Sequence, residues 1–152
     1  MVRLSRAFFV LSLFAASLST PLKRDVVTVQ NDITQKIGPQ LDTLNNDLSG
    51  FPASGLTGAV AIQSDVQTLV STVTATNNIQ NTGSFSTVSG TAIIADFQAL
   101  VPTFLATLVN FGDHRNAFAA LPGGQAFILS ELQSLNTAFG NYLDALKGGS
   151  PV

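Results

Sequence analysis

Apolar residues recur every three or four positions along most of the chain after residue 25, which is the spacing of one face of an α-helix. A first stripe runs from Val26 to Leu48 and contains a Gly38-Pro39 step, where we expect a kink. A second stripe, from Ala59 to Val73, has an opposite face of Ser, Thr, Gln and Asn. Its Thr-rich end has some β-propensity, but a strand would alternate every second residue, so the spacing predicts a helix.

The second half of the chain continues this pattern. Ser84 or Ser86 is suited to cap a third helix, and Pro102 is expected to break or bend it. Further apolar positions lead to a strong breaker at residues 122–124, and a last helix extends to Gly148. The short breaks favour antiparallel neighbours. We therefore predict an all-α fold, a single antiparallel bundle of four to five amphipathic helices, counted as five if Pro102 separates two.

The first twenty residues have the order of a secretory signal peptide. Arg3 and Arg6 precede an apolar run, Ala7 to Ala16, and small residues follow. A buried N-terminal helix would not need this order, and the run is shorter than the roughly 20 residues that cross a bilayer. Lys23-Arg24 resembles a propeptide-processing site. We expect a signal peptide (1–20), a propeptide (21–24), a helical domain (25–147) and a flexible tail (148–152), with no transmembrane segment.

Charge and cysteine content exclude several classes of protein. Residues 25–152 carry three basic and nine acidic side chains, a net charge of −6, which disfavours nucleic acids and anionic membranes as partners. Cysteine is absent, so disulfides, zinc-thiolate sites and cysteine nucleophiles are excluded. The sequence has no Asn-x-Ser/Thr triplet, whereas its Ser and Thr content leaves O-glycosylation open.

No catalytic or metal-binding motif stands out. His114 is the single histidine, between Asp113 and Arg115, and we expect it in an exposed turn, because one histidine alone makes a poor metal site. A Gly-x-Ser-x-Gly elbow and a Gly-rich phosphate loop are missing. The acids are scattered singly, and we find no carboxylate pair that would act as an acid/base dyad. We expect a protein that is not an enzyme and has no cofactor or metal.

The phenylalanines are concentrated in the second half, mostly between Phe97 and Phe139. They could form an ordinary core, or their helices could enclose a cavity or open against a hydrophobic surface. An alkyl chain gains about 0.8 kcal/mol per buried methylene, so such a site needs no polar motif. As contact residues for a lipid or an apolar surface we choose positions on three stripes: Ile62, Val66, Leu69, Phe97, Leu100, Phe104, Leu108, Phe127, Leu135 and Phe139.

Three stretches resemble the fungal hydrophobic surface binding protein family, which includes the cell wall galactomannoproteins. In Phe97-Gln-Ala-Leu-Val-Pro-Thr-Phe-Leu-Ala-Thr-Leu108, a Leu-x-Pro followed by a further Leu is similar to a helix entry of the family. Leu132-Gln-Ser-Leu-Asn-Thr-Ala-Phe-Gly-Asn-Tyr-Leu143 is similar to its closing helix, and Asp32 to Leu48 also fits. The resemblance covers roughly Val26 to Leu146 and contains no catalytic signature.

The resemblance implies a helical bundle, secreted or cell-wall-associated, that binds hydrophobic surfaces or fatty-acid-type lipids. Cell-wall polysaccharide and a secreted hydrolase are further partners that it suggests. Lys36, Arg115 and Lys147 are the cations available to a fatty-acid carboxylate, and the sequence places none of them at a pocket mouth. The alternative is a structural O-glycosylated cell-wall mannoprotein, indicated by the Ser/Thr-rich faces. A hydrolase rests only on the presence of Ser, His and Asp.

Overall fold

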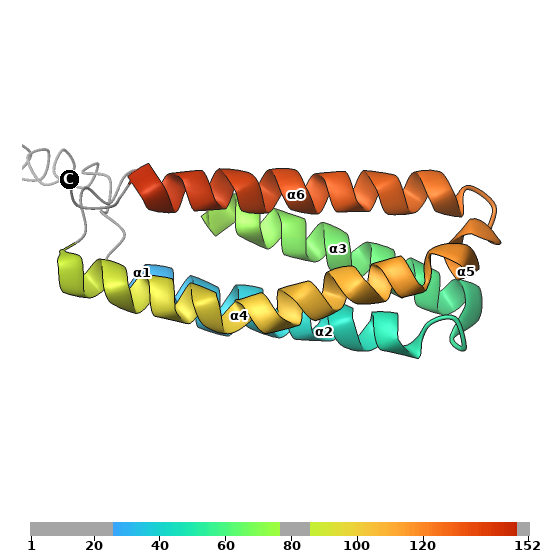
Figure 1. The fold of residues 1–152 in the computed structure, drawn as a ribbon, viewed down its shortest axis with the longest axis horizontal. Helices are drawn as coiled ribbons and strands as arrows, with labels where there is room; N and C mark the ends of the chain where they lie inside the picture. Colours follow the sequence, from blue (N-terminus) through green and yellow to red (C-terminus); the bar gives the residue numbers. More distant parts are fainter. Residues whose placement is uncertain (1–25, 77–85, 149–152) are drawn as a thin grey trace, which may run out of the picture.

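The computed structural model describes residues 26–76 and 86–148, and all of the regular structure in these two stretches is helical (Figure 1). The predicted all-α bundle is confirmed. The leader, the Lys23-Arg24 pair, the cap candidate Ser84 and the tail after Gly148 lie outside the described residues. The elements in chain order are α1 (Val26–Asn31), η1 (Asp32–Ile37), α2 (Gly38–Gly50), α3 (Gly55–Thr76), α4 (Thr87–Asp113), α5 (Arg115–Ala119) and α6 (Gly124–Gly148).

The disturbance expected at Gly38-Pro39 takes the form of a π-helical turn. Pro39 has no N–H to donate to the carbonyl four residues earlier, so a regular α-helix cannot run through it unchanged. The preceding six residues form η1, and the Gly38 N–H bonds to the carbonyl of Ile33, five residues back. As a result α1, η1 and α2 follow one another without a loop and share one buried apolar face.

Pro102, by contrast, does not separate two helices. It lies on the exposed side of α4, which runs without interruption from Thr87 to Asp113. The chain instead turns at His114, so the apolar stretch that precedes the breaker at residues 122–124 is divided there and yields the short α5. The other expectation for this helix is confirmed: the Ser86 side chain caps it by accepting the N–H of Ser89 at 3.2 Å.

We call the continuous helical segment of α1, η1 and α2, from Val26 to Gly50, the α1–α2 rod. The long helices form two side-by-side pairs: the α1–α2 rod lies beside α4, and α3 lies beside α6 (Figure 1). The Gln30 amide donates to Asp96 at 2.7 Å and the Asn110 amide donates to Asn45 at 2.9 Å. Both contacts join positions about 65 residues apart, so the rod and α4 run in the same direction. Consecutive long helices are antiparallel, as predicted. Within each side-by-side pair, however, the two helices run in the same direction.

Three edges of this four-helix arrangement are closely packed, between α2 and α3, α3 and α6, and α2 and α4. The backbones of α4 and α6 stay further apart than those of the other neighbours. The core therefore comes mainly from the rod, α3 and α6, and α4 buries only two apolar side chains completely, Ile93 and Phe111. The largest fully buried side chains are Ile33, Ile37, Leu41, Leu44, Leu48, Ile62, Leu69, Phe111, Phe118, Leu135 and Tyr142.

An aromatic cluster closes the end of the bundle at which α5 lies. Phe51, just after α2, stacks on Phe118 of α5 with ring centroids 4.1 Å apart. Phe127 of α6 lies 5.9 Å from the same Phe118 ring. The His114 ring meets Phe51 edge-on, with ring centroids 5.9 Å apart. His114 lies in a turn, as predicted, but it is half-buried against the cluster instead of exposed.

Candidate functional site

Exposed apolar side chains gather on α4. Ile94, Val101, Leu105 and Leu108 are spaced by seven, four and three residues, which places them on one side of the helix, and we call them the outer stripe. Each is more than a third exposed, and Leu105 reaches 55%. No ionisable side chain occurs between Phe97 and Gly112. The helix thus presents an uncharged apolar face outward.

The hydropathy of α4 reinforces this picture. Of the described helices, α4 is the one long and apolar enough to cross a membrane, with a mean hydropathy of 1.8 over 18 residues. A core helix of a folded protein can have the same composition, but its residues are then mostly buried. Only 11% of that window is buried in the bundle. Much of the apolar surface of α4 is therefore available to something outside the protein.

Polar contacts along one edge of α4 fix its rotation. Asp96 accepts from Gln30, and the Asn110 amide donates to Asn45 and, at 3.2 Å, to Ser49. These residues hold the polar edge of α4 against the α1–α2 rod. The opposite edge, which faces α6, is consequently apolar.

An apolar groove lies along that opposite edge, between α4 and α6. Its lining residues, which define the seam groove, expose no polar surface to it, and its volume is about 170 Å³. Across it, Phe104 and Phe139 approach with ring centroids 4.9 Å apart. Leu41 of α2 is the only lining residue from outside α4 and α6. The full lining is Leu41, Phe97, Leu100, Val101, Phe104, Phe139 and Leu143.

A second hollow of about 190 Å³ continues the seam groove toward the C-terminal end of α6. It shares Phe97 and Leu143 with the seam groove and also includes Ile94, Leu146 and Lys147. Each hollow is smaller than the roughly 300 Å³ at which ligand pockets usually begin, so each would hold only part of a long molecule. Together they make an open apolar trough with a cation at one end.

Lys147 is the cation that the sequence could not place. Its amino group lies 3.0 Å from the carboxylate of Asp144, and both side chains are well exposed. An exposed ion pair of this kind contributes little stability, so Lys147 is free in energetic terms to bind another anion. An alkyl chain with an acidic head fits this arrangement of apolar trough and terminal ammonium.

The ten contact residues chosen from sequence divide into four groups. Phe97, Leu100, Phe104 and Phe139 come together in the seam groove. Leu108 lies on the outer stripe, and Phe127 lines a separate hollow of about 230 Å³ beside Leu121. Buried in the core, with at most 2% of their surface exposed, are Ile62, Val66, Leu69 and Leu135.

Sequence reasoning missed Leu41, Val101, Leu105 and Leu143, and it named Lys147 only as one of three cations available to a carboxylate. Leu41 belongs to the first apolar stripe and is buried in the core. One edge of the Leu41 side chain also forms the floor of the seam groove. The seven-residue spacing of Ile94, Val101 and Leu108, without an intervening charge after Asp96, is the signal that marks the outer stripe. Their exposure was not readable from the pattern.

The structure also brings together two carboxylates that the sequence did not pair. Burial raises the pKa of Asp65 to about 6, and a hydrogen bond with Asp47 and the charge of Asp47 act in the same direction. Asp47 lies on α2 and Asp65 on α3, so the pair sits at the edge opposite the seam groove. Burial likewise raises the pKa of Glu131 on α6.

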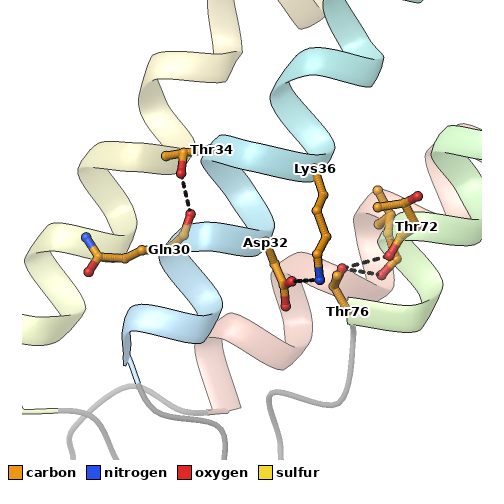
Figure 2. A network of polar contacts seen from close by, with 7 residues as sticks. Gln30, Asp32, Thr34, Lys36, Thr72 and Thr76 are labelled. Atoms are coloured by element: carbon orange, nitrogen blue, oxygen red, sulfur yellow. Dashed lines mark hydrogen bonds and ion pairs between the residues drawn. The ribbon is translucent and has the colours of Figure 1, made fainter.

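The remaining polar groups are structural. Asp32, almost fully buried, pairs with Lys36 at 2.5 Å near the end of α3 that carries Thr72 and Thr76 (Figure 2). A hollow of about 360 Å³ lies between α3 and α6 and is lined mostly by Ser, Thr, Gln and Asn, so it does not suit an alkyl chain. Within residues 26–76 and 86–148, no three metal-ligating side chains gather.

Comparison with known proteins agrees with the apolar character of this surface. A family model described as hydrophobic surface binding protein A matches residues 26–148, which span all the helices described above. No curated protein and no solved structure matches the chain. Because the family match covers most of the sequence, the chain belongs to the hydrophobic surface binding protein A family.

Proposed function

We propose that this protein is secreted and adsorbs to uncharged hydrophobic surfaces through the outer stripe of α4. The observation that carries the proposal is the exposure of Ile94, Val101, Leu105 and Leu108 on a helix face without charge. An exposed apolar patch of about 300–600 Å² already marks a functional surface on many proteins. At about 25 cal/mol per Å², covering such a patch supplies roughly 7–15 kcal/mol before the entropic cost of association.

The charge distribution favours neutral surfaces over anionic ones. Interfacial helices that bind anionic membranes carry Lys and Arg beside their apolar face. The outer stripe has none, and the described residues carry three basic against eight acidic side chains. A neutral polymer, wax or oil surface therefore suits α4 better than an anionic bilayer.

A second capacity, binding of fatty-acid-type lipids, is supported by the trough between α4 and α6. The seam groove is wholly apolar, and the adjoining hollow ends at Lys147. The alkyl chain would lie against Phe97 and Leu143, with the carboxylate near the Lys147 ammonium. The open form of the trough fits a chain that is held along its length with one side still accessible.

Adsorption to octyl-coated beads tests the main proposal with a matched pair of variants. Leu105 on the outer stripe and Val60 on α3 are similarly exposed, at 55% and 57%. We expect Leu105→Lys to lower the adsorbed fraction at least tenfold and Val60→Lys to leave it nearly unchanged, because only the first places a charge in the contact. Equal losses in both variants, or none in either, would contradict the role of α4.

The leader and the Lys23-Arg24 pair belong to the same proposal. A signal peptide over residues 1–20 and a cut after Arg24 would release a mature chain that begins at Asp25. Intact-mass measurement of the protein from culture medium would identify this N-terminus. The same spectrum would show any O-linked hexose, which is the mark of the alternative, a structural cell-wall mannoprotein. We propose no enzymatic activity.

A further inference from the structure

We propose that in solution the outer stripe is covered by a second copy of this chain, in a symmetric dimer formed by two antiparallel α4 helices. The inference rests on the proposed function in one respect, since the dimer would use the face that adsorbs to surfaces. It goes beyond that function by assigning a resting state in which the apolar face is hidden.

Three of the four residues of the outer stripe are evenly spaced along α4, and the fourth, Leu105, would lie opposite Phe97 of the second copy. Ile94 and Leu108 each lie seven residues from Val101. If a two-fold axis passes beside Val101, then Val101 meets its own copy and Ile94 meets Leu108 of the second chain. An interface of this kind must be self-complementary, and apolar residues paired in this way satisfy that condition.

The same helix has the repeat that helices use to pack along one another. Ile94, Val101 and Leu108 alternate by threes and fours with Phe97, Phe104 and Phe111, as the two apolar positions of a heptad do. The phenylalanines of this repeat turn toward the bundle, where Phe111 is buried and the other two are half-buried. The aliphatic members each stay more than a third exposed, with Val101 bordering the seam groove and Ile94 the adjoining hollow, so part of their apolar surface is uncovered within the described chain.

The distribution of charge lets two copies of the chain approach each other more readily through α4 than through other faces. The described residues carry a net charge of −5, so two copies repel each other over most orientations. Along α4 no ionisable side chain occurs between Phe97 and Gly112, and Asp96 is turned away toward Gln30. The stripe is thus an apolar strip on which two acidic molecules meet without placing like charges opposite each other.

The expected dimer is weak. The 27 residues of α4 form a helix about 40 Å long and roughly 10 Å wide. One face of this helix therefore offers a contact strip of about 400 Å² per copy. Standard interfaces bury about 800 Å² per partner, so an interface of this size is expected to form only a weak and transient dimer. Weakness suits the function, because a large hydrophobic surface can then displace the second copy from the stripe.

The absence of cysteine makes a direct test possible. In Val101→Cys the new thiol would lie on the two-fold axis, beside its own copy, and mild oxidation should convert most of the protein to a disulfide-linked dimer. Val60→Cys on α3, which is more exposed than Val101 (57% against 39%), should nevertheless remain largely monomeric under the same conditions. Cross-linking that is equal in both variants, or absent from Val101→Cys, would overturn the proposed axis.

Light scattering of the unmodified mature protein provides the second measurement. We expect a mass that rises from monomer toward dimer between about 1 and 100 μM, and Leu105→Lys to stay monomeric over this range. A monomer at every concentration would overturn the dimer while leaving adsorption intact, since the bead assay is read separately. A dimer that persists in Leu105→Lys would place the interface on another face.

Discussion

Phe104 of α4 and Phe139 of α6 meet with ring centroids 4.9 Å apart across the one edge of the bundle whose backbones stay apart. Their contact closes the inner end of the seam groove, and beyond it the two helices leave the trough that leads to Lys147. The apolar inner edge of α4 and its exposed outer stripe are therefore neighbouring faces of one helix. Ile94 and Val101 border both faces, whereas Leu105 belongs to the outer stripe and Leu143 to the trough, so substitutions at Leu105 and Leu143 test the proposed adsorption and the proposed lipid binding separately.

Filling the seam groove should block lipid binding without affecting adsorption. Leu143 lines both hollows of the trough, and Leu143→Trp would place an indole ring in a space of about 170 Å³. We expect binding of a fluorescent fatty acid to weaken at least tenfold while bead adsorption is retained. Leu129→Trp, an exposed position on α6 outside the trough, is the control. Unchanged fatty-acid binding in Leu143→Trp would show that the lipid binds elsewhere.

Removing the charge of Lys147 should affect acids but not alcohols. Exposed ion pairs contribute about 0–1 kcal/mol, so Lys147→Gln is expected to weaken fatty-acid binding roughly two- to fivefold. Affinity for the fatty alcohol of the same chain length should not change, as titration of each ligand would show. Arg115→Gln, at the opposite end of the molecule on α5, serves as the control. An equal loss for acid and alcohol would count against the carboxylate contact.

Leu69 of α3 and Leu105 of α4 each belong to an apolar stripe, but truncating them to alanine should affect stability very differently. Leu69 is fully buried, and Leu69→Ala should cost about 2–5 kcal/mol of unfolding free energy, because it removes core contacts and leaves a cavity. Leu105→Ala should change stability by less than about 0.5 kcal/mol. Urea unfolding measures both. A large loss in Leu105→Ala would mean that the outer stripe packs against something within the monomer.

Stability should depend on the protonation of Asp65. Its pKa rises from 3.8 to about 6 on folding, so between these values the folded protein holds a proton that the unfolded chain has released. The unfolding free energy therefore falls as the pH rises from about 4 to 6, and the loss persists at neutral pH.

Thermal melts at pH 4.5 and pH 7 test this dependence. The wild-type midpoint should drop by a few degrees at pH 7, and Asp65→Asn should lessen the drop and melt higher than wild type there. Part of the drop should remain, since burial also raises the pKa of Glu131. If Asp65→Asn were no more stable than wild type at pH 7, neither burial of the Asp65 charge nor its repulsion by Asp47 would destabilise the folded protein.

Local pattern determined the helices of this protein. Periodicity of three and four residues is a property of each segment by itself, so the α3 stripe through Ile62 and Leu69 and the cap at Ser86 were predictable. The family resemblance rested on the same segments. The effect of a proline was less predictable: Gly38-Pro39 produced a π turn, whereas α4 continues through Pro102.

Tertiary structure alone decided which apolar faces are core and which are surface. Ile62 and Ile94 are equally apolar and both lie on helical stripes, yet one is buried and the other is half exposed. The difference arises because α4 packs at the periphery, held by polar contacts such as Asn110 with Asn45, which pair residues far apart in the chain. The same long-range packing put Lys147 at the end of the trough. Helical periodicity shows that a segment has an apolar face. Whether that face packs into the core depends on how the four long helices pack against one another.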